Sequence, residues 1–198
     1  KIVKVNLLTL LFFIPMLAIL VVSFITKTNQ GLLYPFGANI GLGYPMAPQQ
    51  QGMSEMLTLY SNILLYVGLV LTSFITAIGL AGGMYVVRNM VWTEGIFVAN
   101  DFWRGIKLNY KNALQTTLFF TIIFSLSSAL IDIAEFNIAL GEISKFEKVW
   151  MRISQVLSNA FIFVSTLMTF WMVALGVNYT LKFPVLLKNA FLLSVGTF

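Results

Sequence analysis

Four long segments without a charged side chain constrain this chain more than any other feature. They are residues 5–25, 62–87, 113–131 and 153–181. An α-helix rises about 1.5 Å per residue, so about 20 apolar residues cross a hydrocarbon core of about 30 Å. A fifth apolar segment, residues 189–198, starts the same pattern. The sequence therefore predicts an all-α fold, a polytopic transmembrane helical bundle with four full spans and the start of a fifth.

The composition favours lipid over water as the solvent. The chain is 59% hydrophobic and 10% charged, whereas soluble domains carry about 25% charged residues. There are no cysteines and no histidines, which excludes disulfides and removes the commonest metal ligand and general base. The net charge of +5 comes from basic residues that stand singly beside apolar segments. This dispersion favours the lipid bilayer as a partner and argues against nucleic acid.

The distribution of basic residues predicts the orientation. If successive segments cross the membrane alternately, the side with the N-terminus holds the majority of the cations, which are Lys1, Lys4, Arg88, Arg104, Lys107, Lys111, Lys182 and Lys188. The other side holds Lys27, Lys145, Lys148 and Arg152. Because cytoplasmic loops carry the excess of Lys and Arg, we expect a multi-pass cell-membrane protein with a cytoplasmic N-terminus.

Residues 1–198 then form a single membrane domain with two long connections. The Gly- and Pro-containing connection 26–61 is predicted to be extracellular, and the polar joint 88–112 is predicted to be cytoplasmic. The chain starts with Lys1 and stops within an apolar segment. We therefore expect the native protein to be longer at both ends.

The joint contains an amphipathic helical pattern that starts at Asn100, a plausible N-cap. One predicted face holds Phe102, Trp103, Ile106, Tyr110 and Ala113, and the opposite face holds Asp101, Arg104, Lys107 and Lys111. A helix with aromatic residues on one side and cations on the other lies in the headgroup plane. We expect a cytoplasmic, interfacial elbow helix built on Asp101, Phe102, Trp103, Arg104, Lys107 and Lys111.

Two features of the apolar segments bear on helix packing. Gly79 and Gly83 have GxxxG spacing, which lets two helix backbones approach closely, and we expect their partner helix to lie within this chain. Pro15 lies inside the first segment and predicts a kink, because a proline removes a backbone hydrogen bond.

The residues give little support to an enzyme, and we expect no catalytic, cofactor-binding or metal-binding site and no cofactor. No GxxxxGK[ST] phosphate loop is present. Asp132 and Glu135 have helical i, i+3 spacing, but we interpret them as a solvated helix end rather than an acid/base or metal pair.

Uncharged polar residues inside the segments leave a transporter open as an alternative. They could line a path for a neutral solute, or they could form hydrogen bonds between helices, which is the interpretation we favour. The residues are Ser73, Thr76, Ser125, Ser127, Ser128, Ser158, Asn159, Thr166, Thr169 and Asn178.

Several blocks of the chain resemble the YesL-like family of bacterial integral membrane proteins, whose molecular function is unassigned. The blocks are Asn6-Leu7-Leu8 with Phe12 and Pro15, Gly82 to Asn89, Asp101-Phe102-Trp103-Arg104 with Lys107 and Asn109, Lys111-Asn112-Ala113, and Lys188-Asn189-Ala190. Family members are often encoded beside genes for carbohydrate uptake and breakdown. The long connection 26–61 departs from the shorter members.

The resemblance implies an accessory component of carbohydrate (oligosaccharide) uptake or utilisation, with ABC importer subunits or another membrane protein as partners. One alternative is a permease subunit that itself translocates a small neutral solute. A second alternative is a structural or scaffold subunit of a larger membrane complex.

Overall fold

The computed structural model describes residues 2–28, 53–92 and 96–196, and within them the chain is helical apart from residues 96–97, 141–144 and 179–182. The helices are α1 (Ile2–Thr28), α3 (Met53–Trp92), α4 (Val98–Leu140), α5 (Lys145–Asn178) and α6 (Phe183–Gly196). The predicted all-α class is confirmed.

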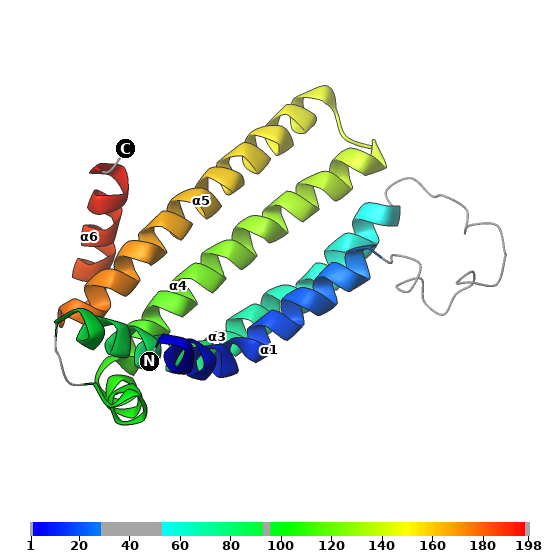
Figure 1. Ribbon diagram of the computed structural model, residues 1–198. Coiled ribbons are helices and arrows are strands. Elements are labelled where there is room, and N and C mark those ends of the chain that lie inside the picture. The colour runs from blue at the N-terminus through cyan, green and yellow to red at the C-terminus, as the bar shows by residue number, and fades with distance from the viewer. Residues whose placement is uncertain (1, 29–52, 93–95, 197–198) are drawn as a thin grey trace, which may run out of the picture.

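Consecutive helices pack side by side, so the bundle follows the order of the chain. α3 lies between α1 and α4, and α5 lies between α4 and α6 (Figure 1). Among the described residues, four helices are long and apolar enough to cross a membrane: α1, α3, α4 and α5. The shorter apolar helix α6 corresponds to the start of a fifth span. This architecture is that of a polytopic helical membrane protein.

Three clusters of buried side chains hold neighbouring helices together. Val5, Val86 and Phe102 join α1, α3 and the start of α4 at one end of the bundle. Leu65, Tyr66 and Leu69 of α3 pack against α1 and α4 farther along. Met168 and Met172 of α5 pack against Leu186 and Ala190 of α6. Because lipid is as apolar as these side chains, close packing supplies most of the stabilisation.

The helices are longer than the predicted spans. α1 continues to Thr28 and α3 starts at Met53, so both ends of the predicted connection 26–61 are helical, and residues 29–52 lie outside the described part. α4 covers the predicted span 113–131 and also flanking residues on both sides. α6 starts at Phe183 rather than at residue 189. A charge-free segment shows which part of a helix fits the hydrocarbon core. The helix itself continues beyond that segment, because turns with charged side chains can stay helical in water.

A tight turn joins α4 to α5. Gly141 ends α4 with a positive φ of 73°, a conformation that glycine adopts without steric cost. Ser144 then caps α5, because its side chain accepts from the Glu147 backbone N–H while the Glu147 carboxylate accepts from the Ser144 N–H at 2.8 Å. This capping box fixes where α5 starts.

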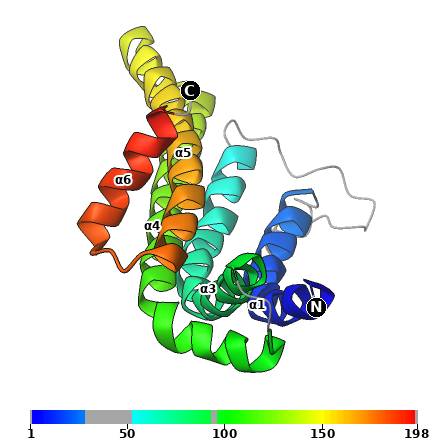
Figure 2. The same ribbon diagram turned by 60° about the vertical axis from the view of Figure 1, so that its left-hand side comes forward.

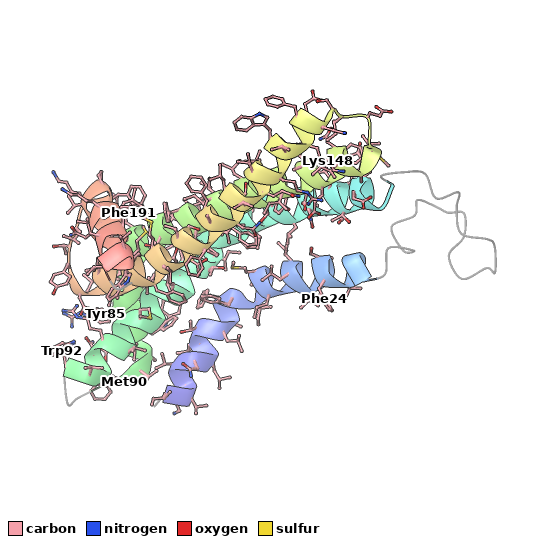
Figure 3. All side chains as sticks on the ribbon, turned by 90° about the horizontal axis from the view of Figure 1, so that it is seen from above. Phe24, Tyr85, Met90, Trp92, Lys148 and Phe191 are labelled. Atoms are coloured by element: carbon pink, nitrogen blue, oxygen red, sulfur yellow. The ribbon has the colours of Figure 1, made fainter. Side chains whose placement is uncertain are left out.

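α1 is not straight. Figure 3 shows that it changes direction partway along, between its N-terminal half and the half that carries Phe24. Pro15 lies inside the helix, where its missing N–H breaks the hydrogen-bond ladder. The bend lets Val5 reach the Phe102 cluster while Met16 and Ile19 pack near Leu65.

Candidate functional site

The elbow is the first part of α4 rather than a separate helix. Figure 2 shows this part lying across one end of the bundle before α4 turns to run along α3 and α5. The predicted N-cap, Asn100, is wrong, because the helix starts at Val98 with Phe97 as N-cap. The Phe97 backbone N–H donates to the Asp101 carboxylate at 3.1 Å. Asp101 therefore stabilises the helix start from within the first turn, where a negative charge also suits the helix dipole.

The two elbow aromatics do not share a face. Phe102 is 1% exposed, whereas Trp103 is 58% exposed. The Phe102 ring stacks on Phe12 with centroids 5.9 Å apart, and a Cβ on Gly82 would lie 2.8 Å from its carbons. The predicted common face is wrong, because neighbouring helix residues point about 100° apart and only one of the two rings, that of Phe102, packs on Gly82.

The elbow is packed against protein on one side and open on the other. Gly105 is buried, and a Cβ there would lie 2.5 Å from Tyr85 Cβ of α3. The cations Arg104, Lys107 and Lys111 are exposed. The elbow thus presents basic side chains outward while its buried side fixes the end of α3.

The GxxxG glycines lie against α1. A Cβ on Gly79 would come within 2.8 Å of Phe12 Cβ and 3.0 Å of the Thr9 carbonyl oxygen. A Cβ on Gly83 would overlap the Thr9 hydroxyl. The partner of this small-residue face is therefore an internal helix, and any larger side chain would separate α1 from α3.

Two polar side chains from neighbouring helices bind the C-terminal end of α5. The Arg88 guanidinium of α3 donates to the Val177 carbonyl at 3.1 Å, and the Asn112 amide of α4 donates to the Gly176 carbonyl at 3.3 Å. The last carbonyls of a helix lack partners within it, and a cation there also complements the helix dipole. Arg88 and Asn112 thus tie three helices together at the end that holds the elbow.

A cavity of about 430 Å³ lies between α1, α3, α4 and α5. Its wall includes the aromatic side chains Phe13, Phe120 and Phe170. It also includes five hydroxyl residues, which are Ser73, Thr76, Thr117, Thr121 and Thr169. Aromatic rings and hydroxyls are groups that can bind a sugar. Whether these hydroxyls already form hydrogen bonds within the protein therefore decides what the cavity can bind.

Each of these hydroxyls already donates a hydrogen bond inside the protein. Thr76 donates to the Thr72 carbonyl at 3.0 Å, and Thr169 donates to the Ser165 carbonyl at 2.7 Å. The other three also donate to backbone carbonyls. Most bonds of this kind stay within one helix, but some join two helices as expected. Ser125 donates to the Tyr66 carbonyl at 3.4 Å, Thr117 donates to the Ser73 carbonyl at 3.3 Å, and Thr76 also donates to the Met16 sulfur at 3.7 Å.

A polar cluster that the sequence interpretation missed lies between α3 and α4. The Asn62 amide donates to Asp132 Oδ2 at 2.6 Å, and the Tyr66 hydroxyl donates to the same oxygen. Asn62 is 1% exposed, and its Oδ1 has no hydrogen-bond partner within residues 2–28, 53–92 and 96–196. Asp132 is therefore not a solvated helix end, whereas Glu135 is exposed as expected.

A signal for this cluster was present in the sequence. Asn62 and Tyr66 are four residues apart at the start of one apolar segment, and Ser128 and Asp132 are four apart at the end of the next. Residues with this spacing share a helix face. Because the two segments are consecutive and antiparallel, their polar faces could be paired.

Comparisons with known proteins found no relatives: no family model, no curated protein and no solved structure matches this chain. The resemblance to the YesL-like family therefore stays a prediction from the residues quoted for it. The fold itself is established by the helices, four of which have the length and apolar character of membrane spans.

Proposed function

We propose that this chain is an accessory subunit of carbohydrate (oligosaccharide) uptake or utilisation in the cell membrane, with a cytoplasmic N-terminus. The carbohydrate setting rests on the resemblance to the YesL-like family. The accessory role, as opposed to a conduit, rests on the cavity between α1, α3, α4 and α5, whose hydroxyls are already committed to backbone carbonyls.

The cavity is a poor site for a sugar. A sugar that leaves water must replace the hydrogen bonds of many hydroxyl groups, and each unreplaced bond costs about 1–3 kcal/mol. The described residues that line the cavity carry no charge. Their five hydroxyls already donate to backbone carbonyls, so they offer a sugar acceptor oxygens but no free donor. The other side chains of the wall are mainly aromatic and aliphatic, which suits an apolar ligand.

Large helical surfaces are available for partners. Among the four candidate spans, α1 buries the smallest share of its most apolar stretch. The N-terminal half of α5 exposes Phe146, Trp150, Val156 and Phe161. In a membrane, lipid or a second membrane protein covers such surfaces, and an importer subunit is the partner that the carbohydrate setting implies.

The proposed orientation follows the basic residues. The elbow, which carries the exposed cations Arg104, Lys107 and Lys111, lies across one end of the bundle (Figure 2). Trp92 and Lys148 lie at opposite ends of the bundle (Figure 3). Because cytoplasmic loops carry an excess of Lys and Arg, we place the elbow on the cytoplasmic side.

Two measurements separate an accessory subunit from a carrier. Liposomes that contain the purified chain alone should not accumulate labelled oligosaccharide above protein-free liposomes. Gentle purification from its native membrane should retain an ATPase or solute-binding protein of an importer. Oligosaccharide uptake by the chain alone would contradict the accessory role, and recovery without an importer component would contradict the carbohydrate setting.

A further inference from the structure

The cluster of Asn62, Tyr66 and Asp132 contains a buried acceptor that the described part of the chain leaves unsatisfied. Both donors, the Asn62 amide and the Tyr66 hydroxyl, converge on Asp132 Oδ2. Among the described residues, Asn62 Oδ1 is buried without a hydrogen-bond partner, and it belongs to the same amide group whose nitrogen donates to the carboxylate. Exchanging the two amide atoms would turn an oxygen toward the carboxylate, so the hydrogen bond itself fixes the amide orientation.

Among the described residues, no positively charged side chain pairs with Asp132. Within the described part of the chain, its hydrogen-bond partners are the neutral side chains of Asn62 and Tyr66. A carboxylate that is partly removed from water requires a compensating positive charge or hydrogen bonds. An ionisable group near the interior of a membrane protein is by default a candidate for a functional site.

The surrounding atoms are oxygens. They come from the Asp132 carboxylate, the Asn62 carbonyl, the Tyr66 hydroxyl and the hydroxyl of Ser128, which interacts with Tyr66. Among the described residues, no three His, Cys, Asp or Glu side chains come together. An all-oxygen set suits a hard cation rather than a transition metal, and one carboxylate neutralises one positive charge.

We propose that Asn62, Tyr66 and Asp132 form a binding site for a monovalent alkali cation of the Na⁺ type between α3 and α4. The cation contacts the orphaned Asn62 oxygen and the Asp132 carboxylate, and it leaves the site electrically neutral. Because the site joins two helices, bound cation stabilises their contact. This site is independent of the accessory role proposed for the whole chain.

The test measures thermal unfolding of the purified protein in detergent as NaCl replaces choline chloride at constant ionic strength. The melting temperature should rise with Na⁺ and saturate, because a ligand that binds only the folded state stabilises it. The Asp132→Asn variant should lose this dependence. The Glu135→Gln variant, which removes an exposed carboxylate from the same helix, should keep it.

Direct binding keeps the proposal falsifiable if Asp132→Asn does not fold. Equilibrium dialysis of the wild-type protein against ²²Na⁺ should show one saturable site per chain. Absence of bound ²²Na⁺ would overturn the proposal, as would a melting temperature that responds to pH but not to Na⁺, since a proton or a water molecule would then occupy the site. A Na⁺ response that persists in a folded Asp132→Asn variant would also overturn it.

Discussion

Replacing Phe102 with Ala tests how the elbow is held. The ring is fully buried, stacks on Phe12, and fills the space above Gly82. It also contacts Val5 and Val86, so a single side chain links α1, α3 and α4. Truncation leaves a ring-sized void at the junction of three helices.

The expected cost follows from this burial. Removing a buried Phe ring from a water-soluble core costs about 3–5 kcal/mol. Part of that cost comes from transferring the ring from the core to water. This part is smaller here, because a detached elbow still rests on the membrane interface. We therefore expect Phe102→Ala to favour elbow opening by about 2–3 kcal/mol, which is about 30- to 150-fold in the opening equilibrium.

An engineered thiol can measure the opening, because the chain has no cysteine. Val86 is 0% exposed and belongs to the same cluster as Phe102. With Val86→Cys as the common background, a water-soluble maleimide reacts only when the elbow opens. When reclosing is faster than labelling, the rate tracks the population of the open state. The Phe102→Ala rate should rise about 30- to 150-fold.

Trp103→Ala is the matched control. Trp103 is the next residue, has a larger ring and is largely exposed. Its removal should change the labelling rate by at most about twofold, as expected for a surface substitution. Equal acceleration by the two variants would refute the inference that Phe102, rather than Trp103, anchors the elbow.

Two further predictions concern helix contacts. Gly83→Leu should destabilise the α1–α3 contact by about 1–3 kcal/mol in detergent unfolding, because its side chain enters space occupied by Thr9, whereas Gly196→Leu, with open space at its Cβ, should be neutral. Arg88→Met should cost about 1.5–3 kcal/mol in the same assay, because it removes a charged hydrogen bond to a helix end, and equal loss in Lys107→Met would contradict this.

Much of the fold could be predicted from hydrophobic pattern alone. The charge-free segments 62–87 and 153–181 lie almost entirely within α3 and α5, because hydrocarbon tolerates few charges over the length of a crossing. The helix ends could not be found in this way, since charged turns in water stay helical. The start of α5 was nonetheless encoded, because Ser144 and Glu147 have the spacing of a capping box.

The candidate sites were less predictable. A helical period placed Phe102 and Trp103 on one face, but the direction of each depends on Gly82 and Phe12 in other helices. The Asp132 partners likewise come from α3. Pairing across helices requires knowledge of which faces meet, and one sequence contains that information only indirectly.

We infer that α4 crosses a membrane, with its elbow on one side and its junction with α5 on the other. Single cysteines at Lys107 and Lys145, introduced into this cysteine-free chain, test it by reaction with a membrane-impermeant maleimide in intact cells. The cysteine at 145 should react in intact cells, and the cysteine at 107 should react only after permeabilisation. Reaction of both cysteines from the same side would contradict it.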